Sequence, residues 1–311
     1  MWHLPTPSKK TIDWYKGLFL DSIKESIKMS RLKKEIKNIL LPGGSAEVIE
    51  ALLTYPPDKL YGYCEELEKR IIKVKNGIFS KQEIYRAFDY DGRISRKKTN
   101  AYELSKRIGT RTCVYCNRVY SFTVEDSDGV AICRPDFDHW LPKKEHPLLS
   151  MSFYNLIPSC PICNRSIKLR SEFEYGKHVH PYGSGKEMQA KFQYEPSLLG
   201  QWKLKLAGAT DAEKETASIL KTEDVYQPYA NGEVKDILDF AYDNPPEYLM
   251  DLKEKVLKAK IAGNSISKER AYRLVFGTEL DSSLFLDRPL SKLKYDVLKQ
   301  LQEDLKISIM D

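Results

Sequence analysis

The sequence predicts an α+β protein that is mostly helical, with a small strand–strand–helix unit between helical N- and C-terminal regions. Three observations lead to this prediction. Apolar residues recur at helical spacing over most of the 311 residues. Between positions 119 and 133 the pattern changes to short apolar runs joined by a turn, and four cysteines in two equal pairs bracket that change. The length allows more than one compact unit, and we expect the divisions 1–100, 101–185 and 186–311.

The first hundred residues are expected to be helical. Ile12, Tyr15, Phe19, Ile23 and Ile27 follow one another at intervals of three or four residues, which places them on one face of a helix. The Pro-Gly-Gly sequence at 42–44 then interrupts the pattern. Further helices are expected over 48–53, 63–74 and 101–108, the last ending at Gly109.

Strand patterns begin between the two cysteine pairs. Val119–Val124 and Val130–Cys133 are short apolar runs, and the polar, glycine-containing segment 125–129 between them predicts a β-hairpin. Residues 164–168 have the composition to begin a helix after the second cysteine pair. Beyond them we expect strands over 189–194 and 201–206, and helices over 211–221, 234–242, 246–262, 267–276 and 291–307.

Composition excludes a disordered chain and a membrane protein. Hydrophobic residues make up 41% and charged residues 30% of the chain, which is typical of a soluble globular protein. The first residues reach Lys9 and Lys10 without the apolar segment of a secretory signal. The longest stretch without Asp, Glu, Lys or Arg is His146–Asn164, and its three prolines argue against a spanning helix. We therefore expect a cytoplasmic protein with no membrane partner.

The net charge of +6 is unevenly distributed. The first 100 residues hold 20 Lys and Arg against 13 Asp and Glu, a net +7, whereas residues 200–311 hold 17 against 20, a net −3. A basic front half is compatible with a polyanionic partner. An ordinary solvated surface explains the same numbers, so charge alone does not decide the function.

Four of the six cysteines form two pairs of equal spacing, Cys113-Val-Tyr-Cys116 and Cys160-Pro-Ile-Cys163, separated by 43 residues. Disulfides are the simplest alternative, but they rarely persist inside cells. A thioredoxin-like redox pair would need a βαβ pattern that neither pair has. Two such pairs suit a tetrahedral Zn²⁺ held by four thiolates, and a filled shell makes this zinc structural. The remaining cysteines are expected to be reduced, partly buried packing residues: Cys64 and Cys133.

Chemically active residue types lie between the cysteine pairs and directly after the second pair. Asp138-His139 follows the predicted hairpin, Asn155 comes sixteen residues later, and Asn164 directly follows the last cysteine. Carboxylate and amide oxygens are ligands that a hard divalent cation prefers. A histidine on the other side of a phosphate can take the proton from water, while the cation absorbs charge on the leaving oxygen. The pattern therefore predicts a single-metal phosphodiesterase.

At these residues the sequence resembles the HNH nuclease family in its zinc-clamped ββα-metal form. The matching motifs are the two cysteine pairs, Asp138-His139-x-x-Pro142, Asn155-Leu156, and Asn164 followed by Lys168. Within that family the chain resembles a bacterial subgroup with the motifs C-x-Y-C-N-R, D-H-x-x-P-K and N-L-I-P-S-C, and a later H-P-Y at 180–182. The resemblance covers roughly residues 108–185, about a quarter of the chain.

The resemblance implies an endonuclease that hydrolyses a phosphodiester to a 5′-phosphate and a 3′-hydroxyl, using Mg²⁺ or Mn²⁺ beside the structural Zn²⁺. Asp138 and Asn164 would be the ligands of the catalytic cation, and His139 would be the general base. Asn155 would hydrogen-bond across the loop and fix the orientation of the histidine. Many relatives have histidine at the position of Asn164, so this chain would be the H-N-N variant. No role follows for His180.

Basic residues around the predicted site are expected to contact a nucleic-acid backbone. A helix start with free N–H groups and nearby cations is suited to bind phosphate. The alternative is that these residues form an ordinary solvated basic surface that binds no ligand. The expected contacts are Lys143, Lys144, Arg165, Lys168 and Arg170.

Partners follow from the same resemblance. We expect a nucleic acid, first of all double-stranded DNA, and a role as an effector in bacterial anti-phage defence beside an ATPase partner or as a homodimer. The alternative is a non-catalytic zinc ribbon that binds nucleic acid or protein. A zinc ribbon requires the four cysteines, but it does not require Asp138, His139 and Asn164 at these positions.

Overall fold

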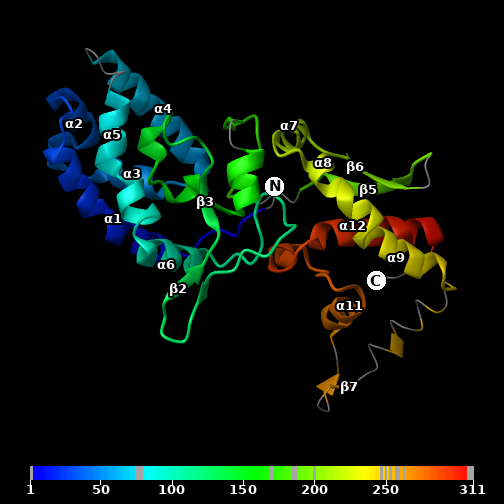
Figure 1. The fold of residues 1–311 in the computed structure, drawn as a ribbon. Coiled ribbons are helices and arrows are strands. Elements are labelled where there is room, and N and C mark those ends of the chain that lie inside the picture. Colours follow the sequence, from blue (N-terminus) through cyan, green and yellow to red (C-terminus); the bar gives the residue numbers. More distant parts are fainter. Residues whose placement is uncertain are drawn as a thin grey trace. The chain divides into compact units, whose positions relative to one another are not determined.

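The computed structural model describes residues 3–74, 80–168, 171–183, 188–198, 201–245 and 267–306, with scattered positions between 248 and 265. The chain is mainly helical with small two-stranded sheets, coloured along the sequence in Figure 1. It divides into two compact units. The first contains residues 3–110 and 121–187, and the second contains residues 111–120 and 188–311. The three-region division expected from the sequence stays a prediction.

Helices make up the N-terminal part of the first unit, as expected. They are α1 (Lys9–Met29), α2 (Lys34–Leu40), α3 (Glu47–Thr54), α4 (Pro57–Lys73), α5 (Lys81–Phe88) and α6 (Lys98–Ile108), with short helical turns at η1 (Pro42–Gly44) and η3 (Asp91–Ser95). The Ser8 side chain caps α1, and α6 ends at Gly109 in the left-handed conformation, with a φ of 75°. None of the helices in the described part of the chain combines the length and apolar character needed to cross a bilayer.

The predicted apolar face of α1 is buried. Tyr15, Ile23 and Ile27 are fully inaccessible to solvent, and Phe19 is nearly so. The Tyr15 hydroxyl also donates a hydrogen bond of 2.9 Å to the carbonyl of Met151. Helix α1 is thereby fixed to the loop that precedes the second strand of the candidate site.

The hairpin predicted over 119–133 is shorter than expected. Only β1 (Val124–Glu125) and β2 (Ala131–Cys133) pair, with an irregular register. Tyr120 instead forms an isolated bridge with Thr112, which removes the start of the predicted first strand from the hairpin.

A second strand pair, which the sequence analysis missed, carries the Asp-His motif. Strands β3 (Asp136–His139) and β4 (Leu156–Ser159) are antiparallel, with Asp138 opposite Ile157 and His139 opposite Leu156. Short helical turns η4 (Pro147–Leu149) and η5 (Phe153–Asn155) lie in the connection between them. The helical turn η6 (Cys163–Ile167) follows β4. It is a π-type turn, in which the Lys168 amide donates to the carbonyl of Cys163 at 3.0 Å, and it lies where the sequence predicted the start of a helix.

The second unit contains one regular hairpin and several helices. The elements are β5 (Lys191–Pro196), β6 (Trp202–Ala207), α7 (Asp211–Ile219), α8 (Thr222–Tyr226), η7 (Gln227–Asn231), α9 (Glu233–Tyr242), α11 (Lys268–Phe276), η8 (Ser282–Asp287) and α12 (Ser291–Leu305). These strands and the helices at 211–221, 234–242, 267–276 and 291–307 were expected. Most of the helix predicted over 246–262 lies outside the described residues. Its end is wrong, because β7 (Lys260–Ile261) pairs with β8 (Asn264–Ser265).

The loop of the first cysteine pair is anchored within the second unit by Asn117. This residue is fully buried and left-handed, with a φ of 47°. Its Nδ2 donates to Thr112 Oγ1, to the Phe285 carbonyl and to the Arg288 carbonyl, and its Oδ1 accepts from the Ser291 amide. The side chain thus satisfies several backbone groups at the start of α12 that would otherwise be buried without a partner.

Candidate active site and metal centre

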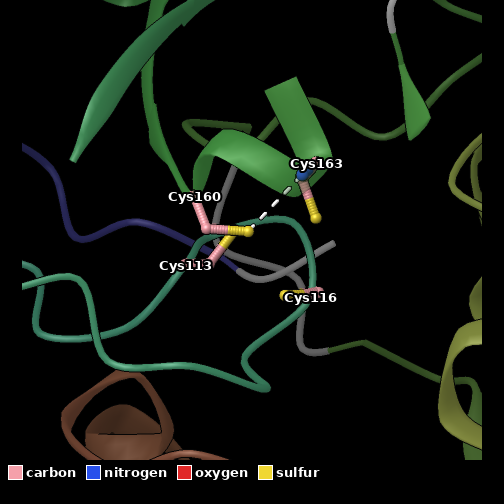
Figure 2. A group of neighbouring side chains, drawn as sticks. All are labelled: Cys113, Cys116, Cys160 and Cys163. Carbon is pink, nitrogen blue, oxygen red and sulfur yellow. Dashed lines mark hydrogen bonds between the residues drawn. The ribbon is translucent and has the colours of Figure 1, made fainter. Parts of the chain in front are cut away.

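The four predicted zinc ligands lie together. The sulfur atoms of Cys113, Cys116, Cys160 and Cys163 are all within 4.8 Å of one another, and all four residues are buried. Figure 2 shows the four side chains and the hydrogen bond of 3.4 Å from the Cys163 amide to Cys160 Sγ. Four Zn–S bonds of about 2.3 Å in a tetrahedron separate sulfurs by roughly 3.8 Å, so only small inward shifts are needed. The cluster could therefore hold a metal such as zinc.

The other two cysteines differ from each other. Cys64 is buried in α4, as expected. Cys133 is exposed, which corrects the expectation that it is partly buried. It lies on the short strand β2, whose last two residues both face solvent.

The predicted catalytic pair lies at the end of β3, beside a cavity of about 600 Å³. Asp138 and His139 both line the cavity, together with Asn164 and the ring of Tyr90. The structure therefore brings three of the four predicted catalytic residues to one cavity.

His139 is held through one ring nitrogen. Its Nε2 lies 2.9 Å from the Ser150 carbonyl, and a carbonyl can only accept, so Nε2 carries the proton. Burial lowers the pKa of His139 to about 3, and the nearby charges of Lys143 and Lys168 act in the same direction. The imidazole is therefore neutral at pH 7, with a lone pair on Nδ1. A phosphate in the cavity would raise this pKa again, because negative charge favours the imidazolium.

Asn155 makes the hydrogen bonds across the loop that the sequence analysis expected. It is fully buried, and its Oδ1 accepts from the Leu141 amide at 2.8 Å. Its Nδ2 donates to the carbonyls of Leu141 and Leu149 at 3.0 and 3.1 Å. Because Leu149 directly precedes Ser150, these bonds also fix the carbonyl that holds His139. Its proposed effect on the histidine stays a prediction.

Asp138 is paired with a buried lysine. The Lys168 ammonium donates to Asp138 Oδ2 at 2.5 Å, to the His139 carbonyl at 2.7 Å and to the Trp140 carbonyl at 3.1 Å. Lys168 is only 4% exposed, and burial lowers the pKa of its ammonium while Asp138 opposes this shift. The sequence analysis expected Lys168 on a nucleic-acid-binding surface. The structure corrects this expectation, since the side chain is enclosed and bonded to the end of β3.

Asn164 lies on η6 and is held by Asp136. Its Nδ2 donates to Asp136 Oδ2 at 3.3 Å, which leaves Oδ1 as the oxygen available to a cation. Arg165 donates to the same carboxylate through Nε and Nη2, at 3.0 and 3.2 Å. A carboxylate oxygen of Asp138 and an amide oxygen of Asn164 are suitable donors for Mg²⁺, and both residues line the cavity. Any such cation would share Asp138 with the Lys168 ammonium.

The cations expected to bind nucleic acid differ in their surroundings. Lys143 pairs with Asp91 at 2.8 Å and lies 4.6 Å from the centre of the Tyr90 ring. Lys144 is exposed, and Arg170 lies outside the described residues. Arg134 also lines the cavity, and the sequence analysis gave it no role. The available signal was its position in Arg-Pro-Asp-Phe-Asp-His, directly before the Asp-His pair.

His180, for which the sequence suggested no role, packs in the interior. Its Nδ1 accepts from the Tyr182 amide at 3.1 Å, so in the neutral ring Nε2 donates to the Tyr61 hydroxyl at 2.8 Å. The Trp140 ring lies 4.6 Å away, centre to centre. Burial lowers the pKa of His180 to about 3.

Comparisons of the chain with protein-family models, with curated proteins and with solved structures found no match. The resemblance to HNH nucleases therefore stays a prediction, and the function of this site must be inferred from its own residues.

The Asp138–Lys168 pair gives the first prediction. Lys168→Met should lower the free energy of unfolding by about 3–5 kcal/mol, because it leaves a buried carboxylate without its cation. The double variant D138N/K168M should recover much of this loss, since neither charge remains. Urea unfolding measures both. The control is Lys106→Met, which breaks the exposed pair with Glu125 and should cost less than about 1 kcal/mol. Equal losses for Lys168→Met and Lys106→Met would contradict the assigned role of the buried pair.

His180 gives a prediction about pH. The unfolded chain takes up a proton at this residue below about pH 6.5, whereas the folded protein does so only near pH 3. Stability should therefore fall as pH falls, by about 2 kcal/mol at pH 5 from this residue alone. Unfolding free energies of the wild type and of His180→Gln, measured from pH 7.5 to 5, should show the smaller pH dependence in the variant. Parallel curves would refute the assignment.

Proposed function

We propose that the chain is a metal-dependent endonuclease that hydrolyses phosphodiester bonds, in the first instance those of DNA. One observation carries the proposal. His139 is a neutral imidazole whose Nε2 is fixed by the Ser150 carbonyl, which leaves Nδ1 as a proton acceptor beside a cavity that Asp138 and Asn164 also line. A fixed base next to a pair of oxygen donors is the arrangement that activating water against a phosphodiester requires.

The order of the elements supports the same proposal. Strand β3 ends in Asp138-His139, Asn155 immediately precedes β4, and η6 presents Asn164. This strand–strand–helical-turn order agrees with what the resemblance to HNH nucleases implies, although the second and third elements are short.

Each residue of the site has its own role in the proposed reaction. His139 Nδ1 takes a proton from water as the water oxygen attacks phosphorus. The bond from phosphorus to the 3′ oxygen breaks, and the released 3′ oxygen takes a proton from solvent water. Asn155 keeps the loop around His139 closed, and Lys168 holds the Asp138 carboxylate in place. A divalent cation on Asp138 and Asn164 would supply positive charge to the phosphate and to the leaving oxygen. The products are a 5′-phosphate and a 3′-hydroxyl.

We also propose that the four-cysteine cluster holds a structural Zn²⁺, because four thiolates fill its shell and leave no position for substrate. The resemblance further suggests an effector in anti-phage defence, with an ATPase partner or a second copy of the chain.

A non-catalytic zinc ribbon is the second candidate. The observation in its favour is that Lys168 already neutralises Asp138, so the carboxylate is satisfied without a divalent cation. A ribbon, however, gains nothing from a buried, neutral histidine beside that carboxylate.

Cleavage of supercoiled plasmid tests the proposal. The wild-type chain with Mg²⁺ or Mn²⁺ should nick or linearise plasmid, and omission of the divalent cation should prevent this. His139→Ala should reduce the rate at least about 100-fold, because general-base catalysis contributes on the order of 10²–10⁴. His146→Ala is the matched control, a half-buried histidine that pairs with Glu68 and should leave the rate unchanged. Cleavage by His139→Ala at the wild-type rate would show that His139 is not the base.

The zinc proposal is tested by metal content. The purified chain should contain about one Zn²⁺. Cys160→Ser should lose most of this zinc and unfold, because the free energy of metal binding at such a site stabilises the folded state. The exposed Cys133 provides the control, because Cys133→Ser should keep both zinc and fold. A folded, zinc-free Cys160→Ser chain would refute a structural zinc.

A further inference from the structure

We propose that Arg134 and Lys144 are the residues that bind the phosphates of a nucleic-acid strand at this cavity, whereas the other cations around it hold the carboxylates. The inference rests on the proposed function for its ligand. It goes beyond that function because it assigns two roles to the basic residues. Those that pair with a carboxylate hold that carboxylate, and those without an ion pair bind phosphate.

Three of the five cations that line the cavity have a carboxylate partner. Lys143 pairs with Asp91 at 2.8 Å, Arg165 with Asp136 at 3.0 Å and Lys168 with Asp138 at 2.5 Å. Each pair cancels most of its own charge. A phosphate that bound to one of these cations would have to displace a carboxylate already in place, which offsets most of the gain.

The other two cations make no ion pair with any residue in the described part of the chain. Lys144 is exposed and adjoins Lys143 in the loop after β3. Arg134 is half-buried, its guanidinium lies 5.2 Å from the centre of the Phe137 ring, and its Nη1 donates to the Pro135 carbonyl at 2.5 Å. These contacts hold the guanidinium in place without neutralising it. An oriented guanidinium and a flexible ammonium are both suited to phosphate oxygens.

The positions of Arg134 and Lys144 fit a strand that passes the catalytic pair. Arg134 lies four residues before Asp138, and Lys144 lies five residues after His139. Both line the same cavity as that pair. Four carboxylates line the cavity beside its five cations: Asp136, Asp138, Glu145 and Glu172. Asp136 and Asp138 pair with cations of the cavity and Glu145 pairs with Lys81, so the lining keeps a net positive charge that favours a polyanion.

The chain offers two matched comparisons. Lys143 and Lys144 are the same residue type at adjacent positions, one paired and one not. Arg165 and Arg134 are the corresponding arginines. The substitutions Lys144→Gln, Lys143→Gln, Arg134→Gln and Arg165→Gln each remove one positive charge, so the change in long-range electrostatics is common to all four. A difference between them isolates direct contact with phosphate.

The experiment measures binding of a fluorescent 20-base-pair duplex by anisotropy, without added Mg²⁺ or Mn²⁺ to prevent cleavage, between 50 and 200 mM salt. Each phosphate contact contributes about 0.9 to the slope of log K against log salt on duplex DNA. Lys144→Gln and Arg134→Gln should each reduce the slope by about this amount, and the double variant by about twice as much. Lys143→Gln and Arg165→Gln should leave the slope close to that of the wild type.

Equal slopes for all four variants, or larger losses at Lys143 and Arg165, would overturn the inference. Absence of any duplex binding by the wild-type chain would overturn it as well. Because binding is measured without a divalent cation, a chain that binds as expected but never cleaves would refute the proposed hydrolysis and leave this assignment intact.

Discussion

Burying a lysine ammonium costs several kcal/mol unless acceptors surround it, and the end of β3 is built to supply them. The Lys168 ammonium meets the Asp138 carboxylate and two main-chain carbonyls, those of His139 and Trp140. One charged group thereby joins the helical turn after the second cysteine pair to the strand that carries the Asp-His motif. Burial is the main cause of the lowered pKa of His139, and the charges of Lys143 and Lys168 add to it. Lys168 therefore fixes the position of Asp138 and makes a smaller contribution to the protonation state of its neighbour.

The Asp138 carboxylate and the His139 imidazole are held by two separate partners. Lys168 holds the carboxylate from the side of η6. The histidine is held from the loop between the strands, where Asn155 closes the loop and the Ser150 carbonyl accepts from Nε2. Loss of the Lys168 contact should mainly displace Asp138, and loss of the Ser150 contact should mainly displace His139.

Periodicity predicted most of the helices, and equal spacing predicted the grouping of the four cysteines. Both are local patterns with a direct structural cause. The strand pair β3–β4 was missed because Asp-Phe-Asp-His and Leu-Ile-Pro-Ser have little strand composition and depend on tertiary contacts. The burial of Lys168 was missed for a related reason. A lysine near a predicted phosphate site suggests a surface contact, and only the fold reveals the acceptors that enclose it.

The ion pairs around the cavity follow from the cost of gathering acids there. Asp91, Asp136 and Asp138 would repel one another and lose hydration if they were left alone. Each instead has its own cation. Two of these cations, Arg165 and Lys168, lie on η6 and at its end, and Lys143 lies in the loop after β3. These ion pairs hold the carboxylates in defined orientations without a metal. Their cation partners already form ion pairs within the protein, so a count of basic residues overstates the number of cations that remain unpaired at the cavity.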